Sequence, residues 1–170
     1  MSQNKVFIAL GSNIGNWKNN FNQAFHELSK IGFINNFSSI FLSKPYGYTN
    51  QNLFYNTAIE FVTRCDPNTL LRNIQTIEKK MLKKKIFING PRRIDLDIIF
   101  FNKIIMQKKY LTIPHPQAHL RDFVLLPMKE MNPFFVHPGK KKTINNLISN
   151  LTKKYIIKKF NYQRGSLLIY

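Results

Sequence analysis

Cysteine, long apolar runs and acidic residues are all scarce in this chain. Cys65 is its one cysteine, which excludes an intramolecular disulfide and favours a reducing, cytoplasmic location. No stretch approaches the roughly 18–20 uninterrupted apolar residues that a membrane span requires. The apolar run before Gly11 is also too short for the apolar segment of a signal peptide. These absences predict a cytoplasmic protein with no membrane partner.

The scarcity of acidic residues leaves a strong positive charge. Against 26 Lys and Arg stand 8 Asp and Glu, which gives a formal net charge of +18. This charge fits a polyanionic partner such as RNA, and it equally fits an anionic small substrate drawn into a positive cleft. A third explanation is compositional bias, because the chain is rich in Lys, Asn, Ile and Phe, as AT-rich coding produces. The charge alone does not separate the three.

The length and composition favour one globular domain. With 170 residues, 44% of them hydrophobic, the chain can bury a core without disulfides or a structural metal. It contains no internal repeat and no linker that would divide it. We therefore expect a single domain over residues 1–170, with a core at about 5–138 and a Lys-rich tail at about 140–170.

Two helices are predicted from apolar spacing and capping residues. The first begins at Trp17, after Asn16 as its N-cap, and ends before Gly32. The second begins at Asp66-Pro67, where Asp is a favourable N-cap and Pro a favourable first residue, and continues to Met81.

Runs rich in β-branched and aromatic residues predict the strands. We expect strands at residues 5–10, 33–42, 54–63 and 94–101, and a hairpin partner of the last one at 104–111. The order strand, helix, strand, strand, helix, strand predicts an α+β fold with a ferredoxin-like βαββαβ core. The hairpin and a C-terminal helical segment are additions to that core.

Two of the eight acids lie in one predicted strand, in the stretch "NGPRRIDLDIIFF". Asp95 and Asp97 are two positions apart, so on a strand their side chains point to the same face, roughly 6.5–7 Å apart. Carboxylates that close repel each other unless a cation lies between them. Neutralisation by Arg92 and Arg93, or exposure to water, is the simpler explanation for an isolated pair. The apolar surroundings instead favour a hard divalent ion such as Mg²⁺.

Other candidate residues carry weaker signals. Gly11, which starts a Gly-Ser-Asn turn after a strand, suggests a ligand loop but lacks the P-loop and dinucleotide-binding spacings. His115 gains interest from Arg121 and Phe123 downstream, although a lone histidine is usually structural. Asn56 beside Phe54 places an amide in a strand, where it can pair locally or bind a planar heterocycle.

Five motifs, taken together in their order, resemble one enzyme family. They are "ALGSN" at 9–13, "F-x-N" at 54–56, "GPRRIDLDI" at 90–98, "LTIPH" at 111–115 and "R-x-F-x-L-x-P" at 121–127. The pattern is similar to that of the 6-hydroxymethyl-7,8-dihydropterin pyrophosphokinases of folate biosynthesis, from about Lys5 to Pro138. The resemblance implies a monomeric α+β enzyme that moves the β,γ-diphosphate of ATP to the pterin hydroxymethyl group and releases AMP.

The same resemblance implies roles for individual residues. Asp95 and Asp97 would bind two Mg²⁺ ions, and Arg92 would act with them in catalysis. The residues implied for ATP binding are Glu78, Arg92, Ile98, Thr112, His115 and Arg121. The residues implied for pterin binding are Gly11, Ser43, Pro45, Phe54, Asn56 and Phe123.

The chain departs from the family pattern mainly before the Gly-Pro-Arg motif. Lysines replace the usual arginines there, so the charge of Lys83, Lys84 or Lys85 would lack a bidentate fork. Asn89 stands where a tryptophan is common. Two further departures are Tyr110 in place of a basic residue and Lys44 in place of a proline.

Two other function classes fit less well. An RNA-binding module agrees with the charge and a ferredoxin-like fold. However, its aromatic strand signature is missing, and Asp95 and Asp97 would face a polyanion. A nucleotidyltransferase places its Gly-Ser turn close to its metal-binding aspartates, whereas more than eighty residues separate Ser12 from Asp95. We therefore expect small-molecule substrates and no nucleic-acid partner.

Overall fold

The computed structural model describes residues 2–81 and 90–161. None of the helices in these two segments is long and apolar enough to cross a membrane. The helices are α1 (Trp17–Ser29), α2 (Pro67–Lys80), α3 (Asp122–Met131) and α4 (Ile144–Ser149), with a short 3₁₀ turn at Ala118–Leu120. The strands are β1 (Asn4–Ser12), β2 (Gly32–Phe37), β3 (Ile40–Ser43), β4 (Phe54–Thr63), β5 (Asp95–Phe101), β6 (Met106–Lys108), β7 (Leu111–Ile113) and β8 (Ile156–Phe160).

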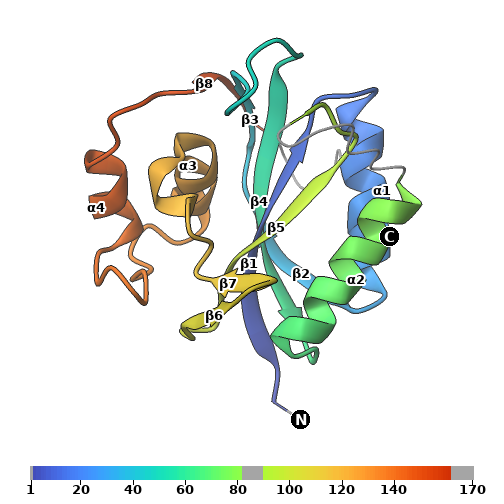
Figure 1. Cartoon of the computed structure of the whole chain (residues 1–170), viewed down its shortest axis with the longest axis vertical. Coiled ribbons are helices and arrows are strands. Elements are labelled where there is room, and N and C mark those ends of the chain that lie inside the picture. Colours follow the sequence, from blue (N-terminus) through green and yellow to red (C-terminus); the bar gives the residue numbers. More distant parts are fainter. Residues whose placement is uncertain (1, 82–89, 162–170) are drawn as a thin grey trace.

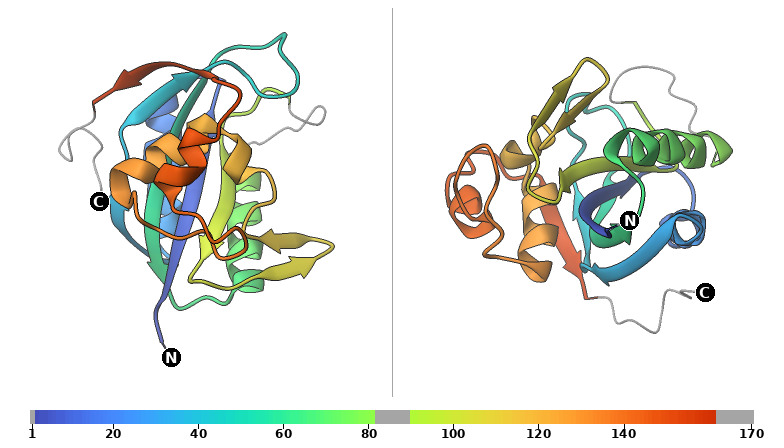
Figure 2. Two further views of the ribbon diagram at one scale, coloured as in Figure 1. Left: turned by 90° about the vertical axis from the view of Figure 1, so that its left-hand side faces the viewer. Right: turned by 90° about the horizontal axis from the view of Figure 1, so that it is seen from below.

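One antiparallel sheet forms the centre of the molecule (Figure 1). Its strand order is β5-β1-β4-β3-β8, and β2 pairs with β4 beside β3. Helices α1 and α2 cover one face of the sheet, and α3 and α4 lie on the other. The view from below in Figure 2 shows the same three layers. The α+β prediction is therefore confirmed.

The residue alternation of the strands feeds two apolar cores. Val6, Ile8 and Leu10 of β1 pack toward α1 and α2, whereas Phe7 packs toward α3 and α4. In β5 the alternation changes sides after a register shift opposite Phe7 and Ile8. Such a bulge inserts one extra residue into a strand. As a result, even-numbered residues face α1 and α2 in the first half of β5, and an odd-numbered residue faces them in the second half.

Local capping confirms the start of both predicted helices. The Asn16 side chain accepts hydrogen bonds from the backbone N–H groups of Lys18 and Asn19. The Asp66 carboxylate accepts those of Asn68 and Thr69. Each cap satisfies N–H groups that the first turn of a helix leaves without partners.

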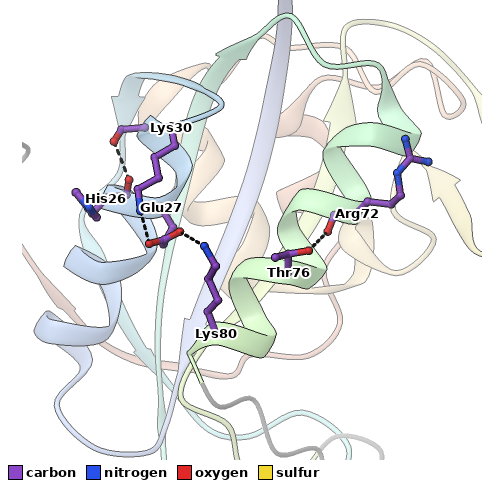
Figure 3. A network of polar contacts seen from close by, with 7 residues as sticks. His26, Glu27, Lys30, Arg72, Thr76 and Lys80 are labelled. Carbon is purple, nitrogen blue, oxygen red and sulfur yellow. Dashed lines mark hydrogen bonds and ion pairs between the residues drawn. The ribbon is translucent and has the colours of Figure 1, made fainter.

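An acidic residue also joins these two helices to each other. The Glu27 carboxylate on α1 accepts from Lys30 of its own helix at 2.6 Å and from Lys80 of α2 at 3.1 Å (Figure 3). The hydrogen bond from Lys30, followed by that from Lys80, lowers the pKa of Glu27. An exposed bridge of this kind contributes little to stability, so the apolar face of each helix remains the main support of the layer.

The predicted strand at 33–42 is wrong as a single element. It is divided into β2 and β3, which pair with opposite ends of β4. At the break, the Ser38 hydroxyl accepts from the N–H of Ala58, and Glu130 accepts from the N–H of Ser39 at 2.7 Å. One backbone hydrogen bond, from the N–H of Ser38 to the Ala58 carbonyl at 2.9 Å, remains at the break, and side chains satisfy the neighbouring N–H groups.

The hairpin prediction for residues 104–111 is also wrong. Strand β6 pairs with β7 in a separate two-stranded sheet and not with β5. Asn102 has a positive φ of 48° and exchanges hydrogen bonds with Lys5 of β1, so the chain turns away at the end of β5. The C-terminal helical segment is confirmed by α4, whereas β8 was not predicted.

His137 makes the pH dependence of stability testable. The ring is 5% exposed, and its Nδ1 accepts from the N–H groups of Gly139 and Lys140, both at 3.2 Å. Burial, with smaller contributions from His119 and Lys140, lowers the pKa of His137 to about 4. The unfolded chain therefore binds a proton near pH 6.5 that the folded chain takes up only near pH 4.

We predict that the shifted pKa of His137 lowers the free energy of unfolding by on the order of 1–2 kcal/mol as the pH falls from 7 to 5. In His137→Asn this part of the pH dependence should disappear, because asparagine can accept a hydrogen bond but does not titrate. Urea denaturation at both pH values measures it. His26→Asn, which changes an exposed histidine of α1, is the control. A His137→Asn variant with the wild-type pH dependence would contradict the assignment.

Candidate active site

The site begins at the carboxyl end of β1, the strand between β4 and β5. In β1, Gly11 lies opposite Asn56 of β4 on one side and Asp95 of β5 on the other. Two residues earlier, Ala9 lies opposite Asp97. A side chain at Gly11 would have Asn56 Oδ1 3.5 Å away and the Phe54 ring 3.6 Å away. Small residues on β1 thus leave open space between the polar side chains of β4 and β5.

This space is a cavity of about 220 Å³ that reaches from β3 and β4 to β5 and α3. It brings together most of the residues that the sequence predicts for the site. Those in its lining are Gly11, Ser43, Phe54, Asn56, Arg92, Asp95, Asp97, His115, Arg121 and Phe123. Lys44 and Tyr46 also line it, although sequence reasoning assigned them no role there.

The carboxylate pair has the predicted orientation. Asp95 and Asp97 face the cavity. Ile94, Leu96 and Ile98 are buried in the core on the opposite face, each at most 5% exposed. Strand alternation explains both observations, because side chains of successive residues point to opposite faces.

Arg92 partly neutralises this pair. Its guanidinium lies 3.1 Å from Asp95 Oδ2 and also stands over the Phe54 ring, 5.6 Å from the centroid. Across the described segments, no cluster of three or more His, Cys, Asp and Glu side chains could hold a metal ion. Two carboxylates still fit Mg²⁺, which usually takes one or two protein carboxylates and completes its shell with water and phosphate oxygens.

The Gly-Ser-Asn turn holds Arg92 in place. The Asn13 side chain accepts from the N–H of Arg92 at 2.8 Å, and the N–H of Asn13 donates to the Arg92 carbonyl at 3.1 Å. The Asn13 amide also donates to Gln51 and to the Asn52 carbonyl, which joins the loop before β4. The turn therefore positions the Gly-Pro-Arg segment, a role that its weak sequence pattern did not reveal.

The Asn56 amide has a defined orientation. It is 6% exposed, and its Nδ2 donates to the Ser43 hydroxyl at 2.9 Å and to the carbonyls of Phe41 and Phe54, both at 3.2 Å. These contacts direct Oδ1 toward Gly11. Asn56 can therefore present a hydrogen-bond acceptor to a planar ligand in the cavity.

Aromatic and cationic groups form the side of the cavity next to α3. The Arg121 guanidinium stacks on the Tyr46 ring at 4.4 Å and lies 5.9 Å from the Phe123 ring. Gln117 accepts a short hydrogen bond from the same guanidinium. Pro45, which lies between Lys44 and Tyr46 in the sequence, is buried but does not line the cavity. Its predicted contact with a ligand therefore remains a prediction.

A second cavity of about 280 Å³ adjoins the first, and Asp97 and His115 line both. Ile98 and Thr112, which were predicted to bind ATP, lie in this second cavity. Its other lining residues are Leu71, Leu96, Lys109, Tyr110, Leu111 and Pro116. The two cavities therefore share Asp97 and His115 as lining residues.

His115 lies uncharged at this junction at neutral pH. Burial, with a contribution from the charge of Arg121, lowers the pKa of His115 to about 4, although Asp95 acts in the opposite direction. Its Nδ1 accepts from the N–H of Gln117 at 3.2 Å. The ring proton therefore belongs on Nε2, which makes His115 a neutral hydrogen-bond donor.

Glu78 lines neither cavity. It is 8% exposed, and its carboxylate accepts from the N–H of Leu96 at 2.9 Å, so it joins the end of α2 to the start of β5. Its predicted contact with ATP remains a prediction. The predicted contributions of Lys83, Lys84, Lys85 and Asn89 lie outside the described residues.

Comparison with solved structures supports the fold. The chain matches an HPPK-DHPS in complex with substrates with a TM-score of 0.72 and 16% identity, over 88% of this chain and 43% of that one. It matches wild-type HPPK-DHPS of Plasmodium falciparum with a TM-score of 0.68 and 19% identity, over 87% and 44% of the two chains. At this level of identity the likeness concerns the fold alone.

Sequence comparison is more specific. The chain is 42% identical over 148 residues to the folic acid synthesis protein FOL1 of Dictyostelium discoideum, which covers 87% of this chain but only 22% of that longer protein. It is 33% identical to the 2-amino-4-hydroxy-6-hydroxymethyldihydropteridine pyrophosphokinase of Aquifex aeolicus, over 88% of this chain and 93% of that one. The corresponding Bacillus subtilis enzyme is 37% identical over 75% and 78% of the two chains. The family model of 7,8-dihydro-6-hydroxymethylpterin-pyrophosphokinase (HPPK) matches residues 7–133, and the chain belongs to that family.

Proposed function

We propose that this protein transfers the β,γ-diphosphate of ATP to the hydroxymethyl group of 6-hydroxymethyl-7,8-dihydropterin and releases AMP, as a step of folate biosynthesis. The family assignment supports this reaction. The observation that carries it furthest is the pair of adjoining cavities, with Asp97 and His115 lining both. We also propose a ferredoxin-like core, which the strand order β5-β1-β4-β3 supports. We further propose that the protein is a cytoplasmic monomer.

The pterin fits the first cavity. Its fused ring is flat and polar at its edge, so it can stack between Phe54 and Phe123 and donate to Asn56 Oδ1. Gly11 and Ser43 complete this part of the lining. The hydroxymethyl group would then point toward Asp95 and Asp97.

ATP fits the second cavity, with its base near Ile98 and Thr112 and its phosphates toward the junction. There Arg92 and Arg121 supply positive charge, and His115 supplies a neutral donor from Nε2. The chemistry needs little more than an in-line arrangement and neutralised charge, because phosphoryl transfer depends mainly on positioning and electrostatics.

Asp95 and Asp97 are the residues that would hold Mg²⁺, and we propose two ions. When bound, the ions would neutralise phosphate charge and lower the pKa of the attacking hydroxyl. The protein's own contribution is to hold both carboxylates facing the cavity. The Arg92 guanidinium, 3.1 Å from Asp95 Oδ2, helps to fix the direction of the Asp95 carboxylate.

The reaction itself is the first prediction of the proposed function. The purified protein with Mg-ATP should release AMP only when 6-hydroxymethyl-7,8-dihydropterin is present, and it should release no ADP. Chromatographic separation of the nucleotides measures both products. Pterin-dependent ADP would indicate transfer of a single phosphoryl group, and no pterin-dependent product would refute the proposed function.

The carboxylate pair gives the second prediction. Asp95→Ala and Asp97→Ala should each lower kcat by about 10³-fold or more, because bound ions contribute several kcal/mol to transition-state stabilisation. Asp66→Asn, which changes the exposed cap of α2, should retain wild-type kcat. Substantial turnover in either alanine variant would contradict the metal assignment.

The Asn56 amide gives the third prediction. Asn56→Ala should raise the KM for the pterin by roughly 10- to 100-fold, the effect of losing a buried hydrogen bond of about 1–3 kcal/mol. The KM for ATP should change much less, because the second cavity keeps its lining. Asn146→Ala, at an exposed position of α4, is the matched control. Equal losses for both substrates would place the pterin elsewhere.

A further inference from the structure

The C-terminal strand returns to the active site from outside the region that the family model matches. That match ends at residue 133, whereas β8 covers Ile156–Phe160. The strand pairs antiparallel with β3, and the N–H of Lys44 donates to the Tyr155 carbonyl at 2.9 Å. In Figure 1, β8 lies beside β3 above the end of α3. Tyr155, the residue before β8, therefore lies next to Lys44 and Tyr46, which line the cavity.

A buried carboxylate fastens this strand to α3. Asp122 is 2% exposed, and its Oδ2 accepts from the N–H of Tyr155 at 2.7 Å and from the N–H of Ile156 at 3.0 Å. It is the first residue of α3, where the helix dipole favours a negative charge. Its neighbours in sequence, Arg121 and Phe123, both line the cavity.

Tyr155 completes a set of three rings in mutual contact behind this wall. Its ring centroid lies 5.5 Å from that of Tyr46 and 5.7 Å from that of Phe123, the latter at an interplanar angle of 88°. The Tyr46 and Phe123 rings are themselves 6.1 Å apart. Tyr46 and Phe123 line the cavity, whereas Tyr155 is half-buried and stands behind them.

Resting on the proposed function, we propose that Tyr155, held by Asp122, is a positioning residue for the pterin. It fixes Phe123 at the angle needed for stacking and Tyr46 beneath the Arg121 guanidinium. Without the Tyr155 ring, Phe123 and Tyr46 lose a shared contact and gain freedom to rotate away from the cavity. The pterin side of the site therefore depends on a strand near the end of the chain.

Steady-state kinetics of Tyr155→Leu in the full chain test this proposal. The KM for the pterin should rise roughly 5- to 20-fold, the order expected when two ring contacts are lost. The KM for Mg-ATP should change by roughly two-fold or less, because Gln117 still holds the Arg121 guanidinium and the second cavity keeps its lining. Tyr155→Phe, which keeps the ring, should restore the wild-type pterin KM. Ile157→Ala, at a 52% exposed position of the same strand, controls for a general loosening of β8.

A double-mutant cycle separates positioning from mere stabilisation. If Tyr155 acts through Phe123, then Tyr155→Leu should raise the pterin KM by roughly two-fold or less in a Phe123→Leu background. Asp122→Asn keeps all three rings but weakens the anchor, so it should shift the pterin KM in the same direction. It provides the test if Tyr155→Leu does not fold.

The outcomes separate this proposal from the proposed function. Pterin-dependent AMP release by the wild type, with an unchanged pterin KM in Tyr155→Leu, overturns the positioning role and leaves the function intact. The same conclusion follows if the pterin and ATP KM values rise together, or if the two substitutions act additively. Absence of pterin-dependent AMP release in the wild type refutes both.

Discussion

The position of β1 between β4 and β5 is the constraint on which the site depends. Antiparallel pairing on both sides brings Asn56 and Asp95 next to Gly11, although the three residues are far apart in the sequence. Strand β1 contributes small residues here, and β4 and β5 contribute the polar side chains of the site. A change of register by one residue would turn both carboxylates into the apolar core. The bulge in β5 lies beyond Asp97, so it does not disturb this arrangement.

All eight acidic residues of this basic chain lie in the segments that the structure describes. Each has a defined place in the described segments: Glu27 joins two helices, Glu60 contacts Lys5 and Asn35, and Asp66 caps α2. Glu78 holds β5, Asp122 holds β8, and Glu130 contacts Ser39 and Lys159. The two that remain, Asp95 and Asp97, face the cavity. Acidic residues thus occur at a helix cap, at contacts between elements and at the candidate site.

Features that depend on neighbouring residues could be predicted from the sequence. The period of two in "IDLDI" places the carboxylates on one face, and Asn16 and Asp66 mark the helix starts. Features that depend on distant contacts could not. The division of residues 33–42 requires Ala58 and Glu130, and the turn after β5 requires Lys5. The grouping of Ser43, Asn56 and Phe123 was available only through family resemblance, and the structural roles of Asn13 and Glu78 emerge only from their contacts with Arg92 and Leu96.

The reciprocal hydrogen bonds between Asn13 and Arg92 carry a consequence for folding. The two residues are separated by 79 positions, so their contact closes one of the longer loops in the molecule. Closing such a loop costs chain entropy, and the favourable free energy of pairing β1 with β5 offsets that cost. The helices, by contrast, can form from contacts within a few residues of each other. The candidate site therefore forms only when residues far apart in the sequence have come together, and its completion requires β1 to pair with both β4 and β5.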